Sequence, residues 1–517
     1  MNYNLLKAYN RAAVFELEGT APYYTEEPYD VYLDGKLVLR DEKRNIFSLS
    51  ELAPDTAYKV SVNGTEKNFT TMKETFLLNI REFGAVGDGI NDDTAFIQAA
   101  ILSCPKGGTV LVPKGTYRTT SIFLKSDITL YLKENSKLMA INDRKKYPIL
   151  PEAKMSEDEQ DELILGTWEG NPLCSYAGLI TGIGINNVNI IGEGILDGDA
   201  INGDWWVNAK VKNIAWRPRM IFLNGCENID IQGIRVENSF SWTIHPYYTD
   251  DLRIYDVSIY NPYLSPNTDG INPESSQRVE IVGTRISVGD DCISFKSGKY
   301  YMAKHHYRPT KDVVVRNCLM KRGHGGVVIG SEVASGIENV SIDKCLMLDT
   351  DKGLRIKTRR GRGKTSYLNN IEITNSRFQD VKVPFSINMF YFCDPDGHSE
   401  YVYSKEKYPV DELTPRVGKI AIRNVKCENA TIASTFFYGL PEEPIGEITM
   451  EDVSIHLEKT FVKEIPVMMD EIEPIAHLGI FAKNVKTLKL KHVEVYGYEG
   501  ERLITENIES FEEISNH

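Results

Sequence analysis

Asn228-Ile229-Asp230-Ile231 is one copy of a short pattern that recurs along the chain: a polar residue followed by two apolar residues with one other residue between them. Further copies stand at Asp251-Leu252-Arg253-Ile254, Arg278-Val279-Glu280-Ile281, Asp312-Val313-Val314-Val315, Asn339-Val340-Ser341-Ile342 and Asn370-Ile371-Glu372-Ile373. A period of two between apolar residues is typical of strands with one face turned inward. Successive copies begin roughly 23 to 34 residues apart, which is a solenoid period.

The segments between these copies decide which solenoid the pattern predicts. None carries a helical pattern long enough for a βαβ fold, and a β-propeller needs four strands in each repeat of about 40 or more residues. We therefore predict an all-β fold, a right-handed parallel β-helix of the pectin-lyase-like type, over residues 76–517. One helix is expected over Thr94–Leu102, with Asp92 or Asp93 as its cap. This helix would close the open apolar end of the β-helix.

Residues 1–75 show a different pattern, with short alternating strands and tight turns. Asp34-Gly35 and Asn63-Gly64 are strong signals for β-hairpins. The apolar spacing from Leu49 to Val62 resembles the fibronectin type III module, with Tyr58 as its corner tyrosine. We predict a small fibronectin type III-like β-sandwich before the β-helix.

Composition limits the classes of partner. The chain is 42% hydrophobic and 26% charged, and no apolar run approaches the roughly 18 residues of a membrane span. Its net charge of −14 argues against a nucleic-acid partner. The eight cysteines are scattered without the close pairs of a zinc site, so no metal or cofactor is expected. Without a standard secretion signal in Met1–Thr20, we expect a cytoplasmic protein, or a secreted one if the sequence was trimmed.

Four short motifs in the second half of the chain carry the ionisable groups that a catalytic site needs. They are Asn267-Thr268-Asp269-Gly270, Gly289-Asp290-Asp291, Gly323-His324-Gly325 and Arg355-Ile356-Lys357. Each motif follows the one before by about one coil, and neighbouring coils stack about 4.8 Å apart. The four motifs should therefore line one groove over roughly 15 Å.

Together these motifs resemble those of the polygalacturonases of glycoside hydrolase family 28, over a match that runs from Phe83–Gly89 to near the C-terminus. The family hydrolyses α-1,4-galacturonan with inversion. The resemblance implies that Asp290 is the general acid and that Asp269 and Asp291 activate the water. It implies that His324 hydrogen-bonds the carboxylates or the substrate.

The resemblance also implies a substrate-binding set. Asn267 matches a residue that orients the site, and Arg355 and Lys357 match cations that bind the galacturonate carboxylate, for which an arginine fork is well suited. Tyr391 matches a tyrosine beside the scissile bond. In a chain of this net charge, the basic run 355–364 would supply the local positive field that an anionic sugar chain needs.

Two expectations concern mechanism. Inversion requires acid and base carboxyls about 6.5–9.5 Å apart, with room for a water between them. Clustered carboxylates repel each other's charges, so one of them can keep its proton near neutral pH.

The mode of action is expected to be exo. Segment 142–173 interrupts the strand pattern and resembles the insertions that block one end of the groove in bacterial exo-acting members, some of which also carry an N-terminal fibronectin type III domain. The expected substrate is a pectin-derived oligogalacturonide, and the product is galacturonate or digalacturonate.

Three alternatives stay open. One is a rhamnogalacturonan or xylogalacturonan hydrolase of the same family. Another is a calcium-dependent β-helix pectate lyase, and the third is a non-catalytic β-helix adhesin. His245 either lines the cleft or packs in the interior. The oligomeric state is not predicted.

Overall fold

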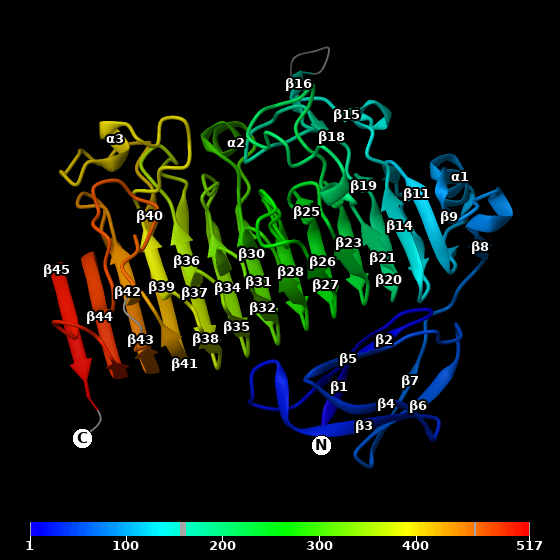
Figure 1. Ribbon diagram of the computed structural model, residues 1–517, viewed down its shortest axis with the longest axis horizontal. Coiled ribbons are helices and arrows are strands. Elements are labelled where there is room, and N and C mark those ends of the chain that lie inside the picture. The colour runs from blue at the N-terminus through cyan, green and yellow to red at the C-terminus, as the bar shows by residue number, and fades with distance from the viewer. Residues whose placement is uncertain (1, 156–161, 460–461, 516–517) are drawn as a thin grey trace.

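The structure is a computed structural model that describes residues 2–155, 162–459 and 462–515. Figure 1 shows a long stack of coils and, beneath the half that comes first in the chain, a small separate sandwich. Strands of successive coils pair in parallel within one large sheet. The predicted parallel β-helix is confirmed.

Three ladders of parallel strands run along the described part of the stack. The first contains the pattern that recurs in the sequence: β8 (Leu77–Asn79), β10 (Gly108–Val112), β13 (Ile128–Leu132), β20 (Asn186–Gly192), β23 (Glu227–Gln232), β26 (Asp250–Tyr255), β28 (Gln277–Val282), β31 (Thr310–Arg316), β34 (Ile337–Asp343), β37 (Tyr367–Thr374), β40 (Arg416–Val417), β41 (Lys419–Ala430), β43 (Ile445–Leu457) and β44 (Leu478–Tyr496). The second contains β9 (Asp88–Asp92), β11 (Gly115–Thr119), β14 (Ser136–Ala140), β21 (Ile195–Asp197), β24 (Arg235–Glu237), β27 (Ser258–Tyr260), β29 (Arg285–Ser287), β32 (Leu319–Lys321), β35 (Leu346–Leu348) and β38 (Arg377–Gln379).

The third ladder carries the predicted site residues and is called the site ladder below. Its strands are β12 (Ile122–Phe123), β19 (Ile180–Ile183), β22 (Ile221–Asn224), β25 (Ile244–Tyr247), β30 (Asp291–Phe295), β33 (Gly325–Ile329), β36 (Lys352–Lys357), β39 (Val383–Asn388), β42 (Ala433–Tyr438), the first part of β44, and β45 (Leu503–Ile514). Between β25 and β30, Ile271 and Glu274 form parallel bridges to both neighbouring coils.

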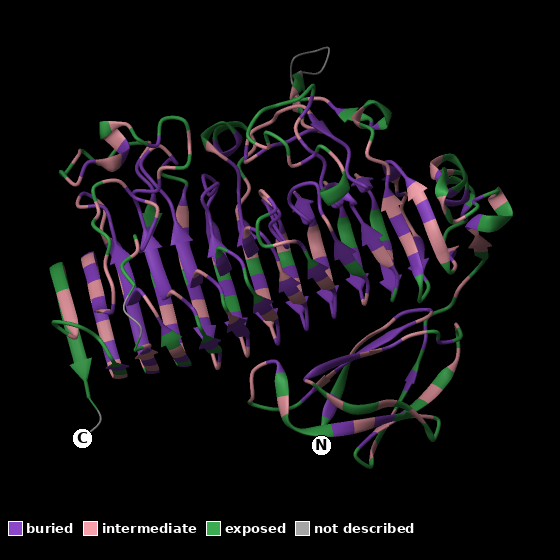
Figure 2. Ribbon diagram, viewed as in Figure 1, coloured by how far each residue is buried: buried purple, intermediate pink, exposed green. Residues whose placement is uncertain are grey.

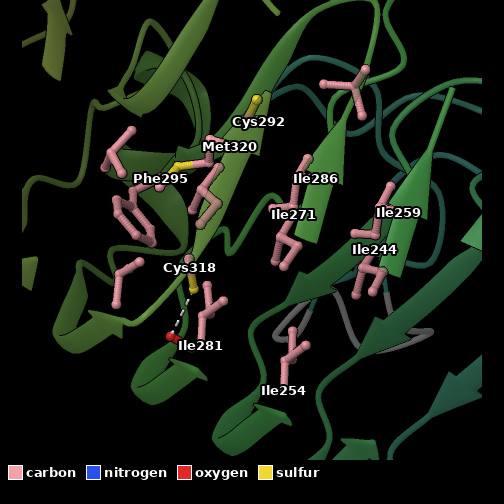
Figure 3. Close-up of a cluster of buried hydrophobic side chains, with 14 of the residues drawn as sticks. Ile244, Ile254, Ile259, Ile271, Ile281, Ile286, Cys292, Phe295, Cys318 and Met320 are labelled. Atoms are coloured by element: carbon pink, nitrogen blue, oxygen red, sulfur yellow. Dashed lines mark hydrogen bonds between the residues drawn. The ribbon is translucent and has the colours of Figure 1, made fainter. Parts of the chain in front are cut away.

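Apolar side chains of successive coils stack inside the β-helix. In Figure 3, Ile254 and Ile281 of the first ladder and Ile244 and Ile271 of the site ladder lie in this interior. All four are fully buried, and burying one such side chain stabilises the fold by roughly 1.5–3 kcal/mol. Figure 2 shows buried residues along the whole stack, whereas β45 at its far end is largely exposed.

Helix α1 (Thr94–Ser103) closes the first end of the stack, as predicted. Ile97, Ala100 and Ile101 of this helix are buried in the main core. Asp93 occupies the N-cap position without a side-chain capping bond, and the Asp92 carboxylate accepts a hydrogen bond from the backbone N–H of Thr94 at 3.1 Å. Two further helices, α2 (Tyr300–His305) and α3 (Glu400–Tyr403), lie among the loops above the site ladder (Figure 1). No helix in the described residues is long and apolar enough to cross a membrane.

The N-terminal sandwich consists of two antiparallel sheets. One contains β1 (Tyr3–Ala8), β2 (Ala13–Leu17) and β5 (Ile46–Leu49), and the other contains β3 (Tyr24–Leu33), β4 (Lys36–Arg44), β6 (Ala57–Val62) and β7 (Thr65–Thr70). Both expected hairpins form, around Asp34-Gly35 and Asn63-Gly64. The Tyr58 hydroxyl accepts a hydrogen bond from the backbone of Ala53 at 2.8 Å. The fibronectin type III assignment itself stays a prediction.

The sandwich is fixed to the β-helix through a separate small core and ion pairs. Tyr9 and Ile46 are buried in one cluster with Tyr255 and Val282 of the first ladder. Around this cluster, Lys7 Nζ lies 2.8 Å from Asp230 Oδ2, Arg44 NH1 lies 2.7 Å from Asp256 Oδ1, and Arg316 Nε lies 3.0 Å from Glu16 Oε1. Buried apolar contact supplies attraction, and the ion pairs fix the orientation of the two parts.

Candidate active site

The four predicted motifs lie on four successive coils of the site ladder. Ile271, two residues after Asp269, pairs with Ile293 of β30. Asp291 pairs with Gly325 of β33, and Val328 of the same strand pairs with Arg355 of β36. Parallel register therefore stacks groups that are up to 88 residues apart in the sequence (267 to 355). The prediction that they share one groove agrees with this placement.

Asp290 and Asp291 are adjacent in the chain, yet both carboxylates reach the same side of the sheet. Alternation along a regular strand would send them to opposite faces. The strand β30 begins only at Asp291, and Asp290 belongs to the turn before it. In that turn, the backbone N–H of Asp291 donates to the Asp290 carboxylate at 3.0 Å. The turn before β30, and not the strand itself, therefore directs the Asp290 carboxylate into the groove.

Asp269, Asp290 and Asp291 form a carboxylate cluster in which one oxygen from each residue lies within 4.8 Å of the other two. Asp269 and Asp291 are buried, while Asp290 is partly exposed. This distance joins single oxygen atoms, so the separation of roughly 6.5–9.5 Å between the acid and base carboxyl groups that inversion requires stays a prediction. The cluster has the ligand set for an oxygen-preferring cation such as calcium.

The three carboxylates have different electrostatic surroundings. Burial, and next the negative charge of Asp290, raise the pKa of Asp269 well above its usual range. Burial would also raise the pKa of Asp291, but the charges of Lys357 and Arg355 lower it to about 2. The surroundings thus favour the protonated form of Asp269 and the ionised form of Asp291.

Arg355 and Lys357 both contact Asp291. Lys357 Nζ lies 2.7 Å from Asp291 Oδ2, and Arg355 NH1 lies 3.3 Å from Asp291 Oδ1. Both cations also lie over the ring of Tyr391, Lys357 at 5.2 Å from the ring centre and Arg355 at 5.7 Å. The structure therefore brings together the predicted cations and Tyr391, and it gives the cations a partner within the protein.

The rest of the predicted basic run points elsewhere. Arg359 pairs with Asp396 at 2.6 Å, Arg360 with Glu442 at 2.5 Å, and Arg362 with Asp394 at 2.7 Å. All three arginines are buried. They serve as structural ion pairs, so the positive field expected from residues 355–364 comes mainly from Arg355 and Lys357.

His324 and Asn267 are each held by a partner that the sequence did not reveal. His324 Nδ1 lies 2.8 Å from Asp351 Oδ2, and this hydrogen bond raises the pKa of His324. Asn267 Oδ1 accepts a hydrogen bond from Arg217 NH2 at 2.6 Å. Asp351 stands four residues before Arg355, so its place beside a predicted site motif could have identified it from the sequence. Arg217 lies in irregular chain, where no repeat indicates its direction.

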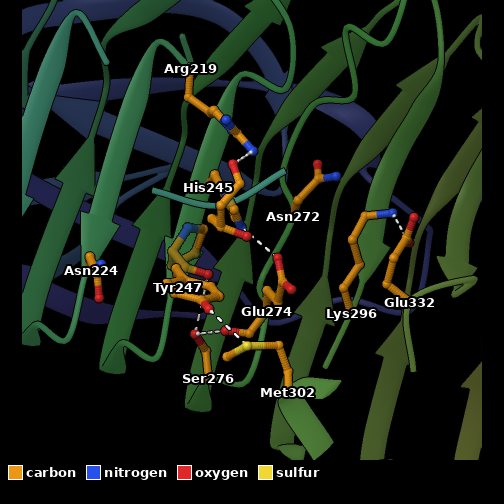
Figure 4. A network of polar contacts seen from close by, with 12 residues as sticks. Arg219, Asn224, His245, Tyr247, Asn272, Glu274, Ser276, Lys296, Met302 and Glu332 are labelled. Atoms are coloured by element: carbon orange, nitrogen blue, oxygen red, sulfur yellow. Dashed lines mark hydrogen bonds and ion pairs between the residues drawn. The ribbon is translucent and has the colours of Figure 1, made fainter. Parts of the chain in front are cut away.

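A buried polar network continues the site ladder on the side of the earlier coils (Figure 4). Asn272 Nδ2 donates to Asp269 Oδ2 at 2.9 Å, which links this network to the carboxylate cluster. His245 is fully buried and lies 2.9 Å from Glu274, so it packs and does not line the cleft. Lys296 Nζ lies 2.8 Å from Glu332 Oε2. Sequence reasoning did not find Asn272 or Lys296.

Segment 142–173, called the insertion below, lies above this network. Its strands are β15 (Ile149–Leu150), β16 (Lys154–Met155) and β17 (Glu162–Leu163), of which β15 pairs with β18 (Ser175–Tyr176) just after the insertion; residues 156–161 lie outside the described residues. Trp168 stacks on Trp216 with ring centres 4.8 Å apart, and Arg219 lies 4.9 Å from the Trp168 ring. The insertion also reaches the chain near α2, because Lys299 donates its backbone N–H to Gly170 at 2.9 Å.

On the side of the later coils the cluster opens into a cavity of about 550 Å³. Its polar wall contains Asp290, His324, Asp351, Lys352, Arg355 and Lys357. Its apolar wall contains Tyr391, Phe392 and segment 465–469. A cavity of this size suits a small ligand, and its charges favour an anionic one.

A parallel β-helix with a cluster of three carboxylates beside cations, next to a cavity, is an arrangement suited to acid/base hydrolysis of a charged polysaccharide. The chain matches the family described as "Glycosyl hydrolases family 28" over residues 110–468, and it belongs to that family. It is therefore a glycoside hydrolase, as its sequence motifs indicated. Residues 77–136 also match the family "Rhamnogalacturonase A/epimerase, pectate lyase-like".

Individual relatives agree with this assignment. A "Probable polygalacturonase" of Vitis vinifera is 30% identical over 403 residues, which cover 76% of this chain and 77% of the relative. An "Exo-poly-alpha-D-galacturonosidase" of Dickeya chrysanthemi is 23% identical over 412 residues, 73% of this chain and 66% of the relative. The solved family 28 exopolygalacturonase of Yersinia enterocolitica covers 100% of this chain and 99% of its own, with a TM-score of 0.73 and 19% identity, a likeness of fold.

Proposed function

We propose that this protein is an exo-acting, inverting hydrolase of α-1,4-galacturonan that releases galacturonate or digalacturonate from oligogalacturonides. The observation that carries the proposal is the carboxylate cluster, which lies beside cations at the end of a cavity and adjoins a face covered by the insertion. The names of the relatives support the same substrate class.

Asp290 is the general acid in this proposal. It is the one member of the cluster that lines the cavity, so a glycosidic oxygen in the cavity can approach its carboxyl group. Asp269 and Asp291 hold the attacking water. Asp291 stays ionised beside Lys357 and Arg355 and can accept a hydrogen bond from that water.

Inversion is supported by how the cluster is held. A retaining mechanism needs a carboxylate that attacks the sugar directly. Asp291 has both oxygens engaged by cations, and Asp269 is buried and bonded to Asn272. Neither is free to form a covalent bond to a sugar in the cavity, whereas both can orient a water.

Exo action follows from the blocked side of the site ladder. Asn272, on the same coil as Asp269, and His245, one coil earlier, are completely buried. A polymer could not continue along that face while the insertion stays closed. The enzyme would then act at a chain end, with steady release of short products and little early loss of viscosity.

The test is product analysis on defined oligogalacturonides with the wild type and Asp290→Asn. We expect mono- or digalacturonate from the first time points, inverted anomeric configuration by NMR, and loss of activity of about 10²–10⁴-fold in Asp290→Asn with an unchanged melting temperature. Initial products of mixed length, or a retained anomer, would contradict the proposal.

A calcium-dependent lyase is the second candidate, because the carboxylate cluster could hold a cation. A lyase would yield an unsaturated product that absorbs in the ultraviolet, and a chelator would abolish its activity. The hydrolase should show neither property. A rhamnogalacturonan or xylogalacturonan hydrolase would instead prefer those polymers in the same product assay.

We further propose a reducing compartment as the place of action. All eight cysteines are free, including the buried Cys318 and Cys345.

A further inference from the structure

Lys352 is a cation of the cavity that the four motifs do not include. It is the first residue of β36, three residues before Arg355, and it lines the same cavity as Asp290 and His324. Its side chain is largely withdrawn from solvent, with the residue only 8% exposed. A lysine is almost never buried to this extent without a partner.

The neighbouring charges are already engaged by other groups. Asp351 is bonded to His324 at 2.8 Å and lies 3.4 Å from Lys382, and Glu464 lies 2.9 Å from Lys382. Within the described ranges of the chain, no ion pair joins Lys352 to a carboxylate. Arg355 and Lys357, in contrast, share Asp291.

The free protein therefore pays an electrostatic cost at Lys352. Burial, and next the charge of Arg355, lower the pKa of Lys352 to about 8, with Lys382 acting in the same direction and Asp351 and Glu464 opposing it. The ammonium group is still mainly charged at neutral pH. A carboxylate that enters the cavity would neutralise this buried charge and form a charge-assisted hydrogen bond.

The apolar part of the lining fits the rest of a sugar. Tyr391, Phe392, Val467 and Met468 add a mainly apolar surface to the cavity, and Arg355 and Lys357 lie over the Tyr391 ring. A pyranose ring has a C–H face that suits such a surface, while its carboxylate and hydroxyl groups point to the polar wall. The cavity thus offers places for both parts of a uronate unit.

We propose that Lys352 binds the carboxylate of the uronate unit that occupies the cavity on the later-coil side of Asp290, beside Arg355 and Lys357, which also contact Asp291. This assignment rests on the proposed function and makes it more specific. Lys352 then distinguishes a free acid from its methyl ester at that unit, because the ester has no charge to neutralise the ammonium group.

The experiment compares Lys352→Met and Lys352→Arg with the wild type on trigalacturonate and on its methyl-esterified form. We expect Lys352→Met to raise KM for the free acid by about 10- to 100-fold, with kcat changed less than threefold. The same variant should leave the methyl ester unaffected, so the preference for the acid is lost. Lys352→Arg should restore most of it. Lys364→Met, which removes an exposed lysine paired with Glu412, is the matched control.

A binding measurement separates this assignment from the proposed function. Calorimetric binding of trigalacturonate to Asp290→Asn should weaken in the double variant with Lys352→Met. If the wild type cleaves trigalacturonate and Lys352→Met has the same KM and the same acid preference, the Lys352 assignment alone is wrong. If the wild type does not cleave it and Asp290→Asn does not bind it, the proposed function is wrong and the assignment with it.

Discussion

Opening the insertion should change the mode of action from exo to endo, and Trp168 is the residue to change. Trp168 is 5% exposed, stacks on Trp216 with an angle of 6° between the rings, and lies under Arg219. It is outside the main core of the β-helix. Trp168→Ala therefore removes contacts that hold the insertion closed and leaves the coils themselves intact.

The size of the effect follows from these contacts. Replacing a buried tryptophan by alanine costs about 3–5 kcal/mol. Because about 1.4 kcal/mol corresponds to a factor of ten, the balance between open and closed insertion should move by about 100- to 3,000-fold. The backbone bond from Lys299 to Gly170 remains and limits the opening to the part around residue 168.

The assay combines viscosity and reducing-end measurements on polygalacturonate with chromatography of the products. The wild type should release short products with little loss of viscosity for each bond cut. Trp168→Ala should produce longer oligomers and a steeper viscosity loss for each bond cut. Hydrogen exchange of residues 162–173 reports whether the insertion has opened.

Phe69→Ala is the matched control, since it removes a buried aromatic residue from the distant sandwich at a similar cost. If residues 162–173 exchange rapidly in Trp168→Ala and the products remain mono- and digalacturonate, the insertion does not determine exo action. If those residues stay protected, the packing around Trp168 contributes less than the magnitude given above.

Three further predictions concern the site. Asp351→Asn should lower the pKa of His324 toward its usual value in an NMR titration, because the bond to Asp351 stabilises the imidazolium. The alkaline limb of kcat/KM should then move to lower pH. The control variant Asp349→Asn should change neither the pKa of His324 nor the alkaline limb. Asn272→Leu should raise the pKa of Asp269 further by removing a donor to its ionised form, so the acid limb of kcat/KM should move to higher pH. An unchanged limb would mean that Asp269 does not control it. Chelator treatment should leave the rate of hydrolysis unchanged, and a loss that added calcium restores would favour the lyase.

Much of the fold could be predicted from the repeated pattern. A period of two within each copy fixed which residues face the interior, as at Ile254 and Ile281, and the distance between copies fixed one coil as the repeat. The same reasoning placed Asp269, Asp291, His324 and Arg355 on four successive coils, because parallel register converts a distance in sequence into a stack in space. The hairpin at Asn63-Gly64 could be predicted for the same reason, because its turn depends on these two adjacent residues.

What the tertiary structure alone decided is how the side chains of the site pair with each other. The sequence gives the charges of Arg355 and Lys357, but only the structure shows that both contact Asp291 and that Lys352 faces the cavity without a carboxylate partner in the described residues. The insertion behaves in the same way, since no repeat predicts that Trp168 stacks on Trp216. Backbone periodicity is a local property that each coil repeats, whereas pairing depends on side-chain direction and on irregular loops that meet only after the coils have stacked.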